Sequence, residues 1–173
     1  MKIFLRFCFN TSIGVWLGAT AFLLILTAAL FTRMPDLAGR VAGLALPVYF
    51  ETGAVCALIA LASVIPLAIL SWGGLSPAKR WIPFVLVAAM AGLNYYGGWV
   101  VLPKAREARV RVHEIQGKPG GAGGRGASTE RSTELARLRE RFQRLHRLSI
   151  RLFGVVFFLL VVTVVHTSFV LRI

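Results

Sequence analysis

The chain has 173 residues, of which 57% are hydrophobic and only 16% are charged, and 20 Lys and Arg against 7 Asp and Glu give a formal net charge of +13. A soluble domain is usually about half apolar and about a quarter charged, so this composition argues against an ordinary soluble domain. Four uncharged runs approach or exceed the roughly 20 residues that a transmembrane helix needs. These runs are apolar on every face, unlike the alternating strands of a β-barrel. The sequence therefore predicts an all-α integral membrane protein with four spans, at approximately 13–31, 48–70, 82–102 and 149–171.

Glycines recur at helical spacing in two of these spans. Gly14 and Gly18 form a GxxxG pair in the first span, which places both on one helix face. Small residues on such a face let a neighbouring backbone approach closely, and this drives helix association where lipid supplies no hydrophobic force. The third span carries Gly92, Gly97 and Gly98. We expect all five glycines to be helix-packing positions.

Residues 36–46 are too few to cross a bilayer, but Leu37, Val41 and Leu44 recur at helical spacing. This pattern predicts a short interfacial helix before the second span. Glu51 then lies about one turn inside the second span, and Asn94 lies within the third. Polar and ionisable residues at membrane depth are candidates for function, so these two positions are of interest.

A charged stretch, 104–116, follows the third span, and the Gly-rich residues 117–128 have the composition of a flexible linker. Beyond the linker, apolar residues alternate at spacings of three and four, which is typical of a helix that packs along a partner. The pattern predicts an extramembrane, arginine-rich helical hairpin over 104–148. The 104–116 helix is too short to cover the whole apolar stripe, so Leu138, Phe142 and Leu145 are predicted to dock another chain.

Four spans place both termini on one side of the membrane and the hairpin on the other. Fifteen of the twenty Lys and Arg lie on the hairpin side. By the positive-inside rule, the hairpin is cytoplasmic and both termini are periplasmic in a bacterial inner membrane. The basic residues would also attract anionic lipids. They are interleaved with Glu and no nucleic-acid-binding module accompanies them, so nucleic acid is not an expected partner.

Few residues suggest a catalytic or cofactor-binding site. His146 and Ser149 share a helix face, resembling a base beside a nucleophile, but no orienting acid or oxyanion site accompanies them. No metal-binding cluster is evident. His166 stands about 30 Å from His146 along one helix, so a bis-histidine haem has no obvious pair within the chain. His166 alone is the candidate for a haem or pigment shared with a neighbour, and the sequence requires no cofactor. We predict that the protein is not an enzyme.

Several motifs resemble the transmembrane protein 205 family and its bacterial relatives. They are the segment Ser12-Ile-Gly-Val-Trp-Leu-Gly18, Pro47-Val-Tyr-Phe50, Asn94 with Pro103-Lys104, and Phe142-Gln-Arg-Leu-His-Arg-Leu-Ser149. Two features depart from that family: Phe153 stands where relatives often have asparagine, and the gap from Asn94 to Pro103 is longer than usual. The resemblance implies four helices and a loose association with metal and platinum-drug tolerance in animals, without a settled biochemical activity.

These observations leave three functional hypotheses. The favoured one is a non-catalytic accessory or structural subunit that packs against a larger membrane complex. An energy-transducing complex is one example. The second is a small oligomeric transporter or metal-tolerance protein that uses Glu51, Asn94, Cys56 and His146 around a midplane site. The third is a pigment- or haem-binding subunit that uses His166.

Overall fold

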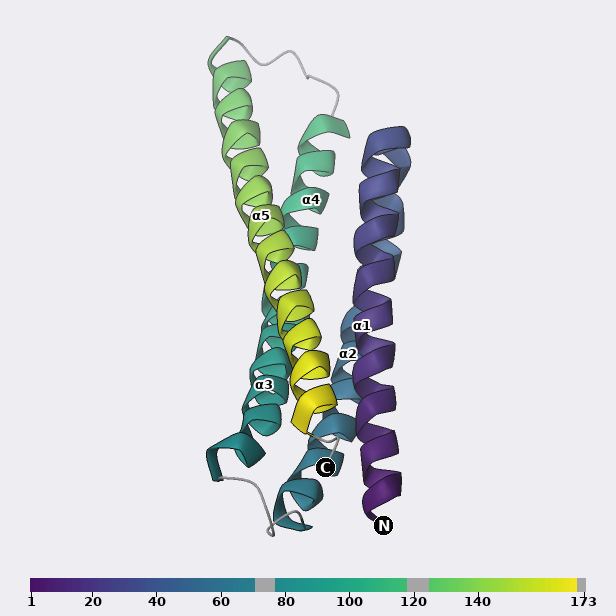
Figure 1. Ribbon diagram of the computed structural model, residues 1–173. Coiled ribbons are helices and arrows are strands. Elements are labelled where there is room, and N and C mark those ends of the chain that lie inside the picture. The colour runs from purple at the N-terminus through teal and green to yellow at the C-terminus, as the bar shows by residue number, and fades with distance from the viewer. Residues whose placement is uncertain (71–76, 118–124, 171–173) are drawn as a thin grey trace.

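A computed structural model describes residues 1–70, 77–117 and 125–170, and the chain is helical almost throughout these ranges. Four long rods lie side by side, and the first residues of the chain and the end of its last helix lie at the same end (Figure 1). The elements, in chain order, are α1 (Lys2–Arg33), α2 (Pro35–Leu70), α3 (Pro77–Tyr96), the π-helix η1 (Gly97–Val101), α4 (Leu102–Gly117) and α5 (Arg125–Val170).

Four segments are long and apolar enough to cross a membrane, namely Lys2–Arg33, Arg40–Leu70, Trp81–Gln116 and Ser132–Phe169. An even number of crossings returns the chain to the side on which it began. This agrees with Figure 1, in which the start of α1 and the end of α5 lie at the same end of the bundle. Within the described residues, the prediction of an all-α chain with four helices long and apolar enough to span a membrane is therefore confirmed.

The start of α2 differs from the prediction. Residues 36–46 are not a separate interfacial helix but the first turns of α2, which begins at Pro35. Met34 alone separates α1 from α2, with φ −144° and ψ 67°, and its N–H donates to Leu30 O at 2.8 Å. Proline disfavours helical geometry at the residue before it and suits the first helical position, so Met34-Pro35 makes a tight turn between two helices.

Helix α2 also continues through Pro47, which cannot donate a backbone hydrogen bond to the carbonyl of Gly43. Arg106 of α4 supplies the missing donor: its Nη2 lies 2.9 Å from Gly43 O. A carbonyl freed by proline inside a membrane helix needs such a partner. This contact explains how the predicted interfacial helix and the second span form one helix.

The third rod is continuous as well, because α3, η1 and α4 follow one another without a break. The π-turn closes with a bond from Leu102 N–H to Gly97 O, five residues apart. It directly precedes Pro103, whose ring and missing N–H would disturb an α-helical ladder at this point. The extra residue of the π-turn lies in the interval between Asn94 and Pro103.

The core is a column of interlocking side chains contributed by α1, α2, α3 and α5. Phe9, Ile13 and Trp16 of α1 are almost fully buried, as are Met90 of α3 and Leu160 of α5. A layer of aromatic rings caps this column where it approaches the hairpin end. Tyr49 lies 4.6 Å from Phe153 between ring centroids, and Phe50 lies 5.7 Å from Phe153.

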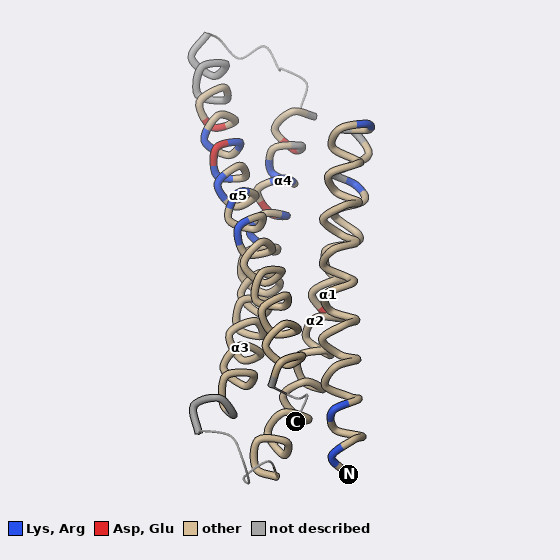
Figure 2. The backbone as a smooth tube through the Cα atoms, viewed as in Figure 1, with Lys and Arg blue, Asp and Glu red and all other residues tan. Residues whose placement is uncertain are grey.

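Beyond the core, α4 and the first half of α5 extend side by side, as Figure 1 shows. Ala108 and Leu138 are buried between them. Lys and Arg gather on these two helices, and others lie at both ends of α1 and near the start of α2 (Figure 2). Of the predicted linker 117–128, residues 118–124 lie outside the described part of the chain, and the others belong to the ends of α4 and α5.

Candidate functional site

A layer of polar side chains crosses the core where α1, α2 and α3 meet. The Thr20 hydroxyl donates to Trp16 O of its own helix at 2.8 Å and lies 3.1 Å from the Tyr49 hydroxyl of α2. Asn94 of α3 donates from Nδ2 to Phe50 O of α2 at 2.9 Å. Buried polar groups in a membrane are tolerated when they bond across helices in this way. The layer ties the three helices together.

Gly53 lies at the centre of this layer. A Cβ atom at this position would lie 2.7 Å from Asn94 Oδ1 and 2.9 Å from Trp16 Nε1. Both atoms are buried, and neither makes a hydrogen bond of normal geometry within the described residues. The indole N–H is a donor and the amide oxygen is an acceptor, so the two are chemically matched across the glycine. The contacts of this layer are between helices of the bundle, so its evident role is to hold α1, α2 and α3 together.

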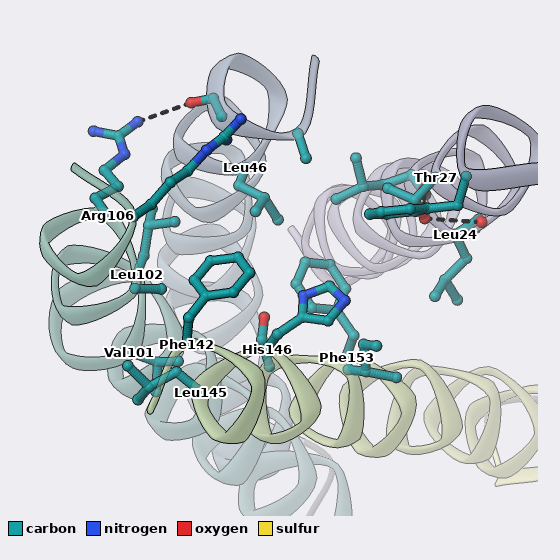
Figure 3. A pocket seen from close by; sticks show the side chains of 18 of the residues that line it. Leu24, Thr27, Leu46, Val101, Leu102, Arg106, Phe142, Leu145, His146 and Phe153 are labelled. Atoms are coloured by element: carbon teal, nitrogen blue, oxygen red, sulfur yellow. Dashed lines mark hydrogen bonds between the residues drawn. The ribbon is translucent and has the colours of Figure 1, made fainter. Parts of the chain in front are cut away.

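A cavity of about 500 Å³ lies between α1, α2, α4 and α5, towards the charged end of the bundle (Figure 3). Most of its lining is apolar, with Leu24, Leu46, Leu102 and Phe153 among the side chains. Its polar members are Thr27, Arg106, Arg109, His146 and Ser149. The Thr27 hydroxyl is already bonded to the carbonyls of Leu23 and Leu24. Apart from the two arginines and the His146–Ser149 pair, the cavity therefore presents a hydrocarbon surface.

His146 and Ser149 both line this cavity from α5. The imidazole of His146 lies between two aromatic rings, 5.9 Å from Phe31 and 6.1 Å from Phe142 between centroids, and it is nearly parallel to Phe142. Among the described residues that line the cavity, none is Asp or Glu. The arrangement suits binding of an apolar group better than general base chemistry, which needs an oriented base within reach of its nucleophile.

The position of Glu51 along the bundle follows from the contacts between α1 and α2. The Thr20–Tyr49 contact and the contact of Trp16 with Gly53 set the register of α1 and α2, so Glu51 is level with about Gly18. At 1.5 Å per residue, Gly18 is about 18 Å from Arg6 and about 22 Å from Arg33, the charged residues that bound α1. Helix α2 starts at Pro35 rather than near Val48, so Glu51 lies level with the middle of α1. Its predicted depth of about one turn inside the membrane stays a prediction.

The Glu51 side chain is exposed and lines an outer groove of about 570 Å³ between α1 and α2. Thr11 and Cys8 form part of the α1 wall, and Thr52 and Cys56 form part of the α2 wall. Neither of the two salt bridges of the described chain involves Glu51. This carboxylate thus lies on the surface of the bundle, within a groove that has several small polar side chains.

The five candidate packing glycines fall into two groups. A Cβ at Gly97 would lie 2.7 Å from Phe50 Cε1, and one at Gly98 would lie 3.0 Å from the same side chain, so both glycines admit the Phe50 ring. Gly14, Gly18 and Gly92 instead have open space at the Cβ position and are exposed. Their faces have no neighbour within the described part of this chain.

The remaining candidates lie in the first half of α5 and near its end. Leu138 is buried against α4, whereas Phe142 and Leu145 are half-buried and line the cavity. The predicted docking stripe thus faces the interior of the single chain. His166 lies near the end of α5, with a buried Nε2 that has no hydrogen-bond partner among the described residues. No group of three His, Cys, Asp or Glu side chains converges within that part of the structure.

Sequence reasoning missed the contacts that depend on tertiary structure. Trp16 and Gly53 meet through the register of α1 and α2, which no local pattern fixes. Arg106 is one of many arginines, and only the fold places it against Gly43. One signal was present: a proline at position 47 within an apolar helix requires an outside donor for the carbonyl of residue 43.

Comparison with known proteins gives one match. The family described as a domain of unknown function (DUF4149) matches residues 11–114, which is more than half of the chain. The match covers most of α1, then α2, α3, η1 and most of α4. No curated protein and no solved structure matches significantly. The match is to an uncharacterised family and does not extend to the more specific resemblance to transmembrane protein 205. The chain belongs to the DUF4149 family.

Proposed function

We propose that this protein is a non-catalytic membrane subunit that binds a second membrane chain along the outer face of α1 and the adjoining groove of α2. The observation that supports this proposal best is the position of Glu51, an exposed carboxylate at the middle of the bundle. A charged side chain in hydrocarbon is costly and is found almost always against a partner group or a water-filled space. A donor or cation from another chain would satisfy it.

The surface beside Glu51 suits a second helix. Gly14 and Gly18 lie on the exposed side of α1, opposite the buried face that carries Phe9, Ile13 and Trp16. Gly18 is also level with about Glu51. An open glycine pair permits close approach of a backbone, and a polar contact at the same height adds to the attraction. The partner helix should carry a small-residue face and a Lys, Arg or amide side chain near the bilayer centre.

The orientation in the membrane is part of the same proposal. The basic residues of α4 and the first half of α5 favour a cytoplasmic, extramembrane hairpin, with both termini periplasmic in a bacterial inner membrane. Cysteine introduced at Ala122 should then resist membrane-impermeant labelling in intact cells and react after lysis. Labelling in intact cells would show that the orientation is the opposite of the proposed one.

The test compares variants of the outer face during purification in a mild detergent, with mass spectrometry of the chains that accompany the protein. Gly18→Leu places a branched side chain between two backbones, and Glu51→Ala removes the carboxylate, so both should release the partner. Gly154→Leu is the matched control, because Gly154 on α5 is also exposed with open space at its Cβ position. Glu51→Gln should retain part of the association, since an amide still hydrogen-bonds.

The proposal is contradicted if Gly18→Leu and Glu51→Ala keep the same companion chains. It is also contradicted if the unmodified protein purifies without any companion. The four spans of each variant should still insert, because the substituted positions face outwards. Protease protection of the membrane fraction separates loss of a partner from loss of the protein.

Transport by an oligomer is the second candidate function, and the same carboxylate favours it, because carboxylates at membrane depth often mark ion pathways. Glu51 and Cys56 line one groove, but Asn94 lies in the core and His146 lies in the cavity near the hairpin. The four residues therefore do not form one path within a chain, and a path would have to form between copies. Ion uptake by proteoliposomes that is lost in Glu51→Gln would support this second reading.

A further inference from the structure

We propose that the cavity between α1, α2, α4 and α5 binds an anionic phospholipid, with one acyl chain inside the cavity and the phosphate at Arg106 and Arg109. The site is separate from the outer face of α1 and does not depend on the proposed partner. Its volume of about 500 Å³ lies within the range of small-molecule sites in proteins.

The cavity spans the boundary between apolar and charged parts of the molecule. Its α5 wall runs from Phe142, in a stretch that carries many arginines, to Phe153, in the uncharged run. Its α1 wall is apolar, because the Thr27 hydroxyl is bonded to its own helix. In Figure 3, Phe142, His146 and Phe153 line one side and Leu24 and Leu46 lie across from them. A ligand that matches this boundary is apolar at one end and charged or polar at the other.

Two arginines, Arg106 and Arg109, line the cavity at this boundary. The guanidinium of Arg106 is held against α2 by its bond to Gly43 O, and Arg109 Nη1 lies 4.0 Å from the Cβ position of the same glycine. The two cations are therefore near one another at the α2 wall. The neighbouring acid on α4, Glu107, forms an ion pair with Arg111 at 2.8 Å, and neither of these two residues lines the cavity. Arginine presents several N–H donors in a fork that suits phosphate.

The head group, rather than the acyl chain, should decide which lipid binds. An acyl chain gains little by moving from the bilayer into an apolar cavity, since both surroundings are hydrocarbon. A phosphate without a compensating ammonium group gains from two arginines near the membrane surface, where each basic residue changes affinity by about fivefold. The ligand is therefore an anionic phospholipid such as phosphatidylglycerol, in preference to zwitterionic phosphatidylcholine.

Native mass spectrometry of the delipidated full-length chain in detergent tests the proposal, with phosphatidylglycerol or phosphatidylcholine added at equal concentrations. The unmodified protein should bind one phosphatidylglycerol at least tenfold more tightly than phosphatidylcholine. Arg109→Gln should weaken the phosphatidylglycerol adduct by about fivefold, and the double variant with Arg106→Gln should weaken it further. Neither change should alter binding of phosphatidylcholine. Arg147→Gln is the matched control, because Arg147 is exposed on α5 and does not line the cavity.

A second pair of variants separates the cavity from the basic surface. Ala105→Phe fills the cavity from α4 and should abolish the one-to-one adduct although both arginines remain. Ala42→Phe fills it from the α2 wall and replaces the first variant if that protein fails to fold by circular dichroism and size-exclusion chromatography. Gly18→Leu should leave lipid binding unchanged, so failure of the partner proposal and failure of this one are distinguishable.

Three results would overturn the inference. Undiminished phosphatidylglycerol binding by a folded cavity-filling variant would place the lipid on the basic surface instead. Equal losses in Arg109→Gln and Arg147→Gln would show that net charge alone attracts the lipid. Equal affinity of the unmodified protein for the two lipids would remove the role of the head group.

Discussion

The two halves of the bundle are packed by different means. Near the middle of the spans, the polar layer around Gly53 is so tight that a single added carbon would lie within 3 Å of two neighbouring side chains. Towards the hairpin, the same four rods separate enough to leave a cavity of about 500 Å³. Both regions contain polar groups, but in the first they face one another and in the second they line an opening.

The difference follows from what surrounds each region. A polar atom in a hydrocarbon layer has no water to bond with, so Thr20, Tyr49 and Asn94 bond to groups on adjacent helices. At the hairpin end, long arginine side chains can extend towards water, so space between helices is tolerated there. Stability should therefore depend mainly on the closed layer, and binding should depend on the open end.

The largest effect is expected where the closed layer has no room. Gly53→Ala should lower the free energy of unfolding by about 1–3 kcal/mol, because the new methyl group displaces the side chains of Asn94 and Trp16. Thermal unfolding in detergent measures this change. Gly154→Ala, at an exposed position with open space, should leave the midpoint unchanged. Equal midpoints for both variants would show that the layer is not closed.

A smaller effect is expected at the contact that joins the open end to α2. Arg106→Ala should destabilise the protein by about 1 kcal/mol through loss of the bond to Gly43 O. In a Pro47→Ala background, the restored N–H of residue 47 can bond to the same carbonyl, so the arginine substitution should cost much less. A double-mutant cycle of unfolding free energies measures the coupling. Additive effects of the two substitutions would refute the link between Pro47 and Arg106.

The smallest effect is expected on the outer face of α1. Gly14→Ala should change the stability of the isolated chain by less than about 0.5 kcal/mol, since open space surrounds the added carbon. Gly97→Ala provides the contrast, because its methyl group would meet the Phe50 ring at 2.7 Å and should lower the melting temperature. A clear loss of stability in Gly14→Ala, measured without a partner, would mean that this face packs within the chain.

Much of the fold could be predicted from the sequence because hydrocarbon imposes strong limits on spanning segments. Run lengths gave the four spans, and the alternation from Leu135 to Leu145 gave the helix that leads into the last one. Helix boundaries at prolines were less predictable. The predicted second span begins at residue 48, but α2 continues through Pro47. The donor to the carbonyl that Pro47 leaves free belongs to a residue 59 positions later, Arg106.

The sites were less predictable than the spans, because each depends on register or on the approach of distant segments. Asn94 was identified as a polar residue at depth, whereas its neighbours Gly53 and Trp16 were not. Glu51 was identified too, but its position along the bundle became clear only from the start of α2 at Pro35. The apolar stripe with Phe142 was found by spacing, yet spacing could not show that it lines a cavity.

The π-turn at Gly97–Val101 rotates the part of the third rod that follows it about the helix axis. An α-helix advances about 100° per residue, and a turn that holds one extra residue delays everything after it by about that angle. Before the turn, α3 packs on α2 and α5, and after it α4 packs on α5. A family member with one residue fewer in this interval would present a different side of α4 to the bundle. The length of five residues thus sets the direction in which Ala105, Arg106 and Arg109 point, independently of what those residues are.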